Sequence, residues 1–398
     1  MRNRGVVTVF FTVSFLLTGC WNANELTELS LISAIGIDQT DNDEFNVSFQ
    51  IINAGEVATG QEGGQRNAVT TVVYSSTGQT IFEAIRKTTQ KVPRKIYFPH
   101  TSLIVVSDRF AKEEGIDKMI DWFERDHEFR TNIQVVIAKD VTAEDILKVQ
   151  SPVERISAKK IISEIETSEK VWGESIVTEI DDIIQALVSK GKEITMSVVT
   201  ITGDEKVGAT MANLQEALPP ASLELLGLAM FKNGRLIRWL DGKEARGTNW
   251  VLDRIDSTIV NLDCNEKTDA IAIEVIRSQT KVQSFIQDDK PTIKITINEE
   301  GNIAETDCSI DLSDFHTIGE IEHQLSEEIR AEAISAIHVA QQEKADIFGF
   351  GNVVEREFPR NWNKYEHEWP EIFSTVAVDV EVNAFIRRPG MRMNPFRN

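Results

Sequence analysis

The sequence predicts a multidomain α+β protein. The chain has 398 residues, of which 41% are hydrophobic. This length exceeds the roughly 100–200 residues of a typical single domain. Its first half alternates strand-like and helix-like segments, and its last third places one long amphipathic helix among strands. We therefore expect an N-terminal mixed α/β module with a helical insertion, and a C-terminal, antiparallel-rich sheet covered by one long helix.

The N-terminus has the features of an export signal. Arg2 and Arg4 precede the uncharged run GVVTVFFTVSFLL, which is shorter than the roughly 20 residues that cross a bilayer. The following LTGC, residues 17–20, resembles the lipobox of bacterial lipoproteins. The resemblance implies that residues 1–19 are a lipoprotein signal peptide and that Cys20 carries diacylglycerol and an N-acyl lipid such as palmitate. The alternatives are an ordinary secretory signal with a chance cysteine, or a short buried helix.

The N-terminal domain, expected over residues 20–213, begins with strands and helices in mixed order. β-branched content and alternation predict the strands, and steps of three and four between apolar residues predict the helices. The predicted strands are 30–38, 44–52, 68–75, 102–106 and 133–138. The predicted helices are 80–90, 108–123 and 143–149.

Beyond Pro152 the pattern changes to two charged amphipathic helices, 153–169 and 174–189, which break near Gly173. A strand is predicted over 196–201. Residues 151–203 are therefore either a helical insertion in the first module or a subdomain of their own, and the sequence alone leaves both alternatives open.

The predicted linker is 214–224, because Pro219 and Pro220 disfavour both helix and central strand. The C-terminal domain, 225–398, then opens with a hairpin of strands 227–231 and 236–240. Its turn contains Asn233 and Gly234, a pair typical of tight hairpins.

The C-terminal domain continues with a short helix, 244–254, and then with strands and one long helix. Apolar residues at steps of three and four draw a single stripe from 314 to 344. Thr317 and Glu320 have the spacing of a capping box, although the helix has room to start earlier. The predicted strands are 257–262, 270–277, 292–297, 303–310 and 375–385.

The formal net charge is −21, from 42 Lys and Arg against 63 Asp and Glu. Nucleic-acid binding rests on clustered cations, so we expect no nucleic-acid partner. An anionic bilayer would repel a body of this overall charge. Attachment to a membrane would therefore depend on lipid, where each buried methylene contributes about 0.8 kcal/mol.

Two cysteines remain after Cys20, and both lie in strand-like segments. Cys264 and Cys308 could be neighbours and form a disulfide outside the cytoplasm. Two unpaired buried thiols are the equally open alternative. The chain has no CxxC motif, so no zinc or thioredoxin-type site is indicated.

No motif for catalysis, metal binding or cofactor binding stands out. The six histidines include no HExxH pair, and His316 and His323 lie too far apart on one helix to share an ion. The glycines of GDEKVGAT place Ala209 where a phosphate-binding lysine is needed, and no GxSxG is present. We expect neither an enzyme nor a resident metal or cofactor.

The run DWFERDHE contains Asp121, Glu124, Asp126 and Glu128 beside aromatic residues. A cation or ammonium site with an aromatic face is one interpretation. A solvated helix end with an aromatic face toward the core is the alternative that the sequence favours.

Several segments, in order along the chain, resemble the Ger(x)C family, the C subunit of endospore germinant receptors. The mature N-terminus CWNANEL contains Trp21 and Glu25, and it runs into IGID at 35–38. Later matches are RKIYFPH, DWFERD with Asp121, Arg125 and Asp126, GLAMFK, and FIRRPG near the C-terminus. The remaining matches lie in the C-terminal domain and comprise DIFGFG with Asp346, Phe348 and Phe350, followed by Trp362 and Trp369.

The resemblance implies a non-enzymatic lipoprotein on the outer, extracytoplasmic face of the spore inner membrane. It would act with a multi-spanning A subunit and a transporter-like B subunit to trigger germination, without binding the germinant directly. The matched residues are then candidates for partner contacts. Asn22 and Ala23 depart from the charged pair expected after Cys-Trp, and Pro99 departs near Tyr97.

A solute-binding lipoprotein that delivers a small molecule to a transporter is the competing class. It requires two similar lobes around a mainly apolar cleft. The two halves of this chain differ in pattern, which argues against that class. A third class, an extracytoplasmic hydrolase, lacks the acid, base and nucleophile that it needs.

Overall fold

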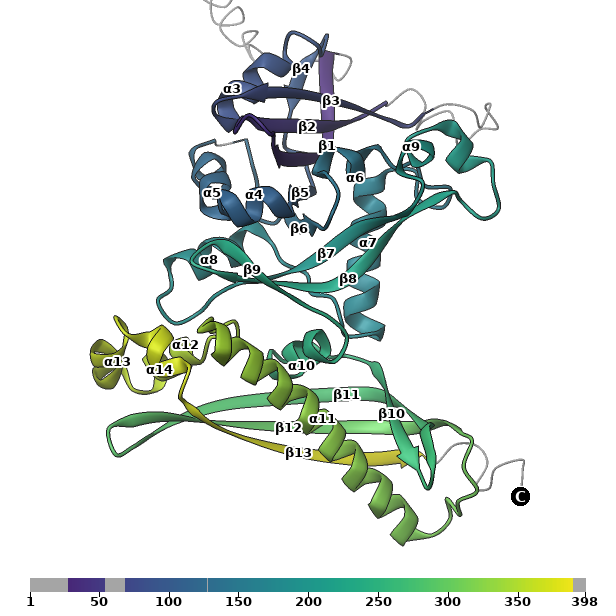
Figure 1. The fold of residues 1–398 in the computed structure, drawn as a ribbon, viewed down its shortest axis with the longest axis vertical. Helices are drawn as coiled ribbons and strands as arrows, with labels where there is room; N and C mark the ends of the chain where they lie inside the picture. Colours follow the sequence, from purple (N-terminus) through teal and green to yellow (C-terminus); the bar gives the residue numbers. More distant parts are fainter. Residues whose placement is uncertain (1–27, 54–68, 127, 389–398) are drawn as a thin grey trace, which may run out of the picture.

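The structure is a computed structural model that describes residues 28–53, 69–126 and 128–388. These residues form two sheets, each with its own helices, and the two sheets lie at opposite ends of the molecule (Figure 1). The mixed α and β content and the multidomain architecture are as the sequence predicts. The sites of interest lie where the two halves meet.

The first sheet has the strand order β3-β2-β1-β5-β6-β7-β8-β9, and β4 pairs with the start of β1. Strands β1, β5, β6 and β7 are parallel, whereas β2, β3, β8 and β9 join antiparallel. The strands are β1 Leu29–Gln39, β2 Phe45–Ile52, β3 Thr71–Gly78, β4 Lys95–Tyr97, β5 Leu103–Ser107, β6 Gln134–Ala138, β7 Thr195–Gly203, β8 Ala221–Lys232 and β9 Arg235–Leu240.

Helices cover both faces of this sheet, as its nearly continuous buried parallel strands require. One hydrophobic core lies under α3, α4, α5 and α8, and a second lies under α6 and α7. The helices are α3 Ile81–Thr88, α4 Asp108–Glu113, α5 Ile116–Arg125, α6 Ala143–Lys148, α7 Ser157–Val171, α8 Ile180–Val188 and α9 Glu205–Gly208, with a 3-10 turn η2 at Met211–Leu214.

Local chemistry sets the helix ends in this part. Thr80 and Thr142 cap α3 and α6 by accepting backbone N–H groups in the first turn. The single helix predicted over 108–123 is wrong, because it divides into α4 and α5 at Gly115. That glycine has φ +94, a conformation that ends a helix and that other residues rarely adopt.

Residues 151–203 are not a separate subdomain. Helices α7 and α8 lie between β6 and β7, and β7 is a member of the main sheet, parallel to β6. Their apolar faces pack on the same cores as the neighbouring helices. The helices are therefore a crossover connection of the first module, which is one of the two alternatives that the sequence left open.

The predicted linker at 214–224 does not divide the two sheets. Strand β8 begins at Ala221, directly after Pro219 and Pro220, and pairs with β7 along the first sheet. The prolines end a turn, and the hairpin of β8 and β9 extends the first sheet. The break between the sheets lies after Leu240, where α10 begins.

The second sheet has the order β10-β11-β12-β13. Strands β10, β11 and β12 are antiparallel, and β13 joins β12 in parallel. The strands predicted at 292–297 and 303–310 are mainly one long strand, and β11 extends well beyond the predicted 270–277. The elements are α10 Lys243–Val251, β10 Thr258–Cys264, β11 Lys267–Gln287, β12 Lys290–Thr306 and β13 Ala377–Arg388.

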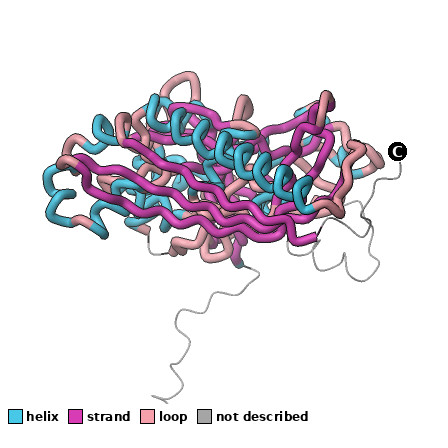
Figure 2. Tube along the Cα trace, turned by 90° about the horizontal axis from the view of Figure 1, so that it is seen from below, coloured by secondary structure: helices cyan, strands magenta, loops and turns pink. Residues whose placement is uncertain are grey.

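Helix α11, Phe315–Glu343, lies along one face of this sheet (Figure 2). Its buried stripe includes Ile321, Leu325, Ile329 and Ala333, as the spacing predicts. The capping-box prediction at Thr317 is wrong, because Asp314 is the N-cap and accepts the His316 N–H.

Three short helices that the sequence pattern does not predict follow α11. They are α12 Phe350–Glu357, α13 Pro359–Tyr365 and α14 Trp369–Phe373. They gather beside one end of α11, on the side of the second sheet that faces the first (Figure 1).

Candidate functional site

The C-terminal motif residues meet at the junction between the two halves of the molecule. Asp346 lies in the turn between α11 and α12 and is 3% exposed. Its Oδ1 accepts the Phe350 N–H at 3.1 Å, and its Oδ2 accepts the Gly351 N–H at 2.8 Å. The carboxyl therefore binds the free N–H groups at the start of α12, which is the position that an anionic side chain favours.

Asp346 also accepts the indole N–H of Trp369, with Nε1 2.9 Å from Oδ2. Burial raises the pKa of this carboxyl to about 6, in spite of the donors from Gly351, Trp369 and Phe350, which favour the ionised form. One carboxyl thus joins the start of α12 to α14. Its two oxygens are occupied by protein donors, so the arrangement holds structure together.

Four aromatic residues of the motifs form two ring pairs in one hydrophobic core cluster. The rings of Phe348 and Phe350 stack with centroids 5.1 Å apart, and Trp362 meets Trp369 edge to face at 5.2 Å. All four are at least nine-tenths buried. Aromatic pairs of this kind add about 0.5–1.5 kcal/mol beyond their area burial.

A loop of the first half packs directly against this cluster. The Glu193 N–H donates to the Asp346 carbonyl at 2.8 Å, and Ser189 donates to the side chain of Asn352 at 2.7 Å. Gly191 and Gly351 touch through their backbones, because a Cβ on Gly351 would lie 2.4 Å from the Gly191 Cα. The cluster around Asp346, called here the Asp346 junction, therefore contacts both halves.

A second buried carboxylate joins the halves through α10. Glu332 of α11 is 1% exposed and accepts from Arg246 Nε at 2.9 Å and from Trp250 Nε1 at 3.0 Å. Asn249 lies on α10, as Arg246 and Trp250 do, and it donates to the carbonyls of Gly173 and Ser175 in the first half. Sequence reasoning missed this site, because its partners lie more than 80 positions apart and no local motif marks them.

Asp38, the last residue of the IGID motif, is the third of these buried acids, and it caps a helix, as Asp346 does. Its two oxygens accept the N–H groups of Ala143 at 2.7 Å and Glu144 at 3.1 Å, at the start of α6. Burial raises its pKa to about 6, although these amides favour the charged form. This motif, too, holds a helix on a strand.

Asp121, Arg125 and Asp126 are far less buried than these acids. The first two form an exposed ion pair across one turn of α5, with 2.7 Å between Nη2 and Oδ1, and the Arg125 guanidinium lowers the pKa of Asp121. Asp126 ends the helix and accepts the Glu128 N–H at 3.0 Å. These residues line an open groove of about 920 Å³ between α3 and α5, and they do not meet the Asp346 junction.

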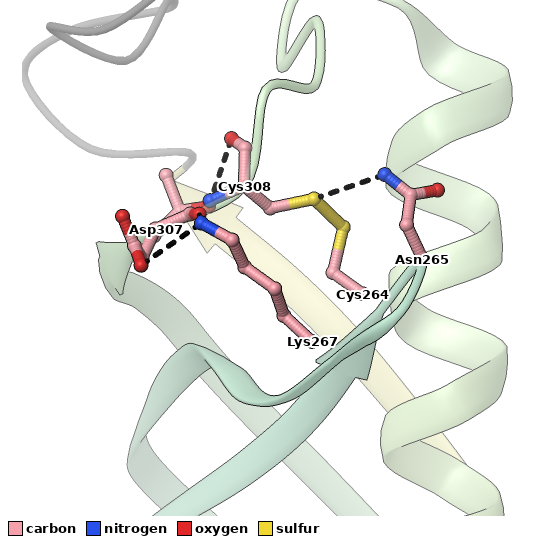
Figure 3. Close-up of a disulfide and its surroundings, with 6 residues drawn as sticks. Cys264, Asn265, Lys267, Asp307 and Cys308 are labelled. Atoms are coloured by element: carbon pink, nitrogen blue, oxygen red, sulfur yellow. Dashed lines mark hydrogen bonds and ion pairs between the residues drawn. A yellow bond between two sulfur atoms is a disulfide. The ribbon is translucent and has the colours of Figure 1, made fainter.

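Of the remaining expected residues, Cys20, Trp21 and Glu25 lie outside the described residues. Cys264 and Cys308 are joined as a disulfide, with Cα atoms 6.2 Å apart (Figure 3). The bond links the end of β10 to the segment after β12. Asn265 donates to the Cys308 sulfur at 3.4 Å.

Within ranges 28–53, 69–126 and 128–388, no group of three acidic, histidine or cysteine side chains is arranged to hold a metal ion. The helices of these ranges include none with the length and apolar character needed to cross a membrane. The chain is thus a multidomain α+β protein in which buried acids cap helices and join the two sheets.

This chain belongs to the spore germination GerAC-like family. Residues 22–201 match the family model "Spore germination protein N-terminal domain", and 226–390 match "Spore germination B3/ GerAC like, C-terminal". The models thus divide the chain near the predicted linker, whereas the sheets divide after Leu240.

Two relatives from Bacillus subtilis (strain 168) are similar over nearly their whole length. Spore germination protein KC is 35% identical over 100% of this chain and 99% of the relative. Putative spore germination protein YfkR is 24% identical over 95% of each. A solved structure, described as the crystal structure of the GerBC protein, shares the fold with a TM-score of 0.53 and 17% identity. That match covers 89% of this chain and 96% of the other.

Proposed function

We propose that this chain is a non-enzymatic, lipid-anchored subunit of a nutrient germinant receptor. It acts on the extracytoplasmic face of the spore inner membrane, through contacts with the integral A and B subunits, and it does not bind the germinant itself. The observation that carries the proposal is the similarity to spore germination protein KC over the full chain. The lipid anchor and the partners come from the lipobox and from the family resemblance.

The anchor is acylated Cys20. The first strand begins at Leu29, nine positions later, and nine residues span at most about 30 Å when fully extended. The first half of the molecule is therefore held close to the membrane. A tether of this length raises the effective concentration of integral partners, so modest interfaces suffice.

The partner contact that we propose includes Asp121 and Arg125. Most of the motif residues in the described ranges are buried and support the fold, whereas these two side chains are 64% and 75% exposed. The ion pair between them contributes little to the stability of α5, since exposed ion pairs are weak. A contact with a neighbouring subunit is a role that their position leaves open.

Affinity capture of the acylated protein from detergent-solubilised spore membranes tests the receptor assignment. We expect recovery of two polytopic subunits with the chain. Recovery of an ABC permease instead would move the assignment to the solute-binding class. Cys20→Ala is expected to release the protein from membranes and impair germination, and normal retention in the membrane pellet would contradict the anchor.

The double variant Asp121→Asn, Arg125→Gln tests the partner contact. We expect an unchanged thermal unfolding midpoint, weaker co-purification of the integral subunits and slower germination. Arg109 and Glu113 also pair across one turn of a helix, α4, and Arg109 bonds Asp41 as well. Arg109→Gln with Glu113→Gln is therefore a control that removes an ion pair from another helix of the first half. Equal effects of both double variants on capture would overturn the contact.

A further inference from the structure

The last turn of α3, the connection that follows it and the first residue of β4 concentrate positive charge in an acidic protein. Between positions 86 and 95 the chain carries Arg86, Lys87, Lys91, Arg94 and Lys95, with no acidic residue among them. The whole chain, in contrast, has 63 acidic against 42 basic residues. We call these five residues the basic end face.

All five side chains of the basic end face are exposed. Lys87 is paired with Glu83 at 2.8 Å, whereas Arg86 stacks over Phe82 with 4.9 Å between its guanidinium carbon and the ring centroid. Lys91 donates to the neutral Ser75 carbonyl at 2.5 Å. In the described part of the chain, Lys91, Arg94 and Lys95 form no ion pair, and the exposed acid next to them is Glu28, directly before the register partner of Lys95.

The basic end face lies where the chain enters the first strand. Strands β1 and β4 are parallel, and their first residues, Leu29 and Lys95, are paired in register. The segments that precede the two strands therefore enter from the same end of the sheet. In Figure 1, α3, β4 and the start of β1 lie together at the end of the molecule away from the second sheet.

The net charge of the whole protein does not decide what this end face binds. Charges in solution interact over a Debye length of about 8 Å at physiological ionic strength. The second sheet lies at the other end of the molecule from α3 and β4 (Figure 1). A cationic surface within the reach of a lipid tether is therefore attracted to anionic lipid. Each Lys or Arg at the surface raises the partition coefficient between membrane and water by about five-fold.

We propose that the basic end face binds the anionic phospholipid headgroups of the membrane that carries the tether. The inference rests on the proposed anchor at Cys20 for its position but not for its charge. The acyl chains hold the protein at the bilayer, and the end face fixes which side of the body lies on it. The second sheet and the Asp346 junction then point away from the headgroups.

Vesicle binding of the chain from residue 21 onward, which keeps every described residue, tests this proposal without acyl chains. We expect sedimentation with vesicles of phosphatidylcholine and phosphatidylglycerol, and none with phosphatidylcholine alone. Binding should weaken between 0.01 M and 0.15 M salt, as the Debye length falls from about 30 Å to about 8 Å. The variant Lys91→Gln, Arg94→Gln, Lys95→Gln should lower partitioning by roughly 100-fold.

The matched control removes the same charges from the second sheet. Arg277, Lys281 and Lys290 are exposed on β11 and at the start of β12, and their triple change to Gln should leave vesicle binding unaltered. Equal loss in both triple variants, or equal binding to neutral and anionic vesicles, would overturn the proposal. Because the assay contains no acylated protein, this result is independent of the Cys20→Ala fractionation that tests the anchor.

Discussion

The indole N–H of Trp369 donates to the buried carboxylate of Asp346 across 2.9 Å. The two residues are 23 positions apart, and the bond fixes α14 against the turn that starts α12. The same carboxylate accepts two backbone N–H groups of α12. One acid thereby joins α12 and α14, and α13 is held beside them by the contact of Trp362 with Trp369. Helices of these lengths are not stable alone.

Replacing Asp346 removes three acceptor contacts at once. Each buried donor left unsatisfied costs about 1–3 kcal/mol, so Asp346→Ala is expected to lower the free energy of unfolding by about 3–5 kcal/mol. Trp369→Phe loses one hydrogen bond and keeps most of the ring, and it should cost about 1–3 kcal/mol. Urea unfolding followed by fluorescence measures both. Near-equal stability of Asp346→Ala and the wild type would contradict this role.

The contact of Gly351 with Gly191 yields a second prediction. A Cβ on Gly351 would meet backbone on the other half, which has no flexible side chain to move aside. Gly351→Ala should therefore destabilise the protein by about 1–3 kcal/mol or more, as overpacking does.

Gly319, exposed on α11 with no atom near its own Cβ position, supplies the control. Gly319→Ala should stabilise the protein by about 0.5–1 kcal/mol through helix propensity. Calorimetric unfolding of the two variants compares them. Opposite signs are expected, and a stabilising Gly351→Ala would show that the two halves are not packed as described.

The sequence predicts what local patterns encode. Local patterns predict the stripe of α11, the strands with alternating residues and the hairpin turn at Asn233, because each depends on neighbours within a few positions. The break at Gly115 was missed, since it requires φ +94 at a glycine that the helical pattern does not reveal. The helices after α11 were also missed, because they are short and depend on Asp346 and the aromatic residues around it.

The candidate site divides in the same way. Motif residues in the C-terminal half were recognised as a set, but their meeting around Asp346 depends on contacts between α12, α13 and α14. No sequence motif indicates the pair of Arg246 and Glu332, since the two residues lie 86 positions apart on different helices. The place of the first hairpin shows the same limit, because the sequence puts it in the C-terminal domain, as the family model does, whereas β8 pairs into the first sheet. Pro219 and Pro220 mark a turn, and only pairing of β8 with β7 shows which sheet follows.

The disulfide predicts a redox-dependent stability. Cys264 and Cys308 close a loop with a sequence separation of 44, and a cross-link of this size stabilises a fold by roughly 4 kcal/mol in the chain-entropy model. Reduction should therefore lower the free energy of unfolding by about 2–4 kcal/mol. Urea titrations with and without dithiothreitol measure the change.

The double variant Cys264→Ala, Cys308→Ala is the control for this measurement. It should match the reduced wild type in stability and no longer respond to dithiothreitol. A response that persists in the double variant, or a wild type that is insensitive to reduction, would show that this bond does not support the second sheet.

Glu299 on β12 is fully buried, and its two carboxylate oxygens have no hydrogen-bond partner among the described residues. Burial, with smaller contributions from Glu300 and Glu322, raises its pKa from 4.5 to about 8. The unfolded chain thus loses this proton at lower pH than the folded protein. The free energy of unfolding should fall as pH rises from about 4.5 to about 8.

Glu299→Gln removes the ionisable group and keeps its size. By pH 7 the wild type has lost about 3 kcal/mol from this carboxyl, at 1.36 kcal/mol per pKa unit. The advantage of the variant should therefore grow between pH 5 and pH 8, when both proteins are unfolded with urea. Glu305→Gln, an exposed change on the same strand, should show no such trend. Asp38 and Asp346 titrate alike in all three proteins, so the difference between variant and wild type isolates Glu299, and a constant difference across this range would mean that the carboxyl is ionised in the fold.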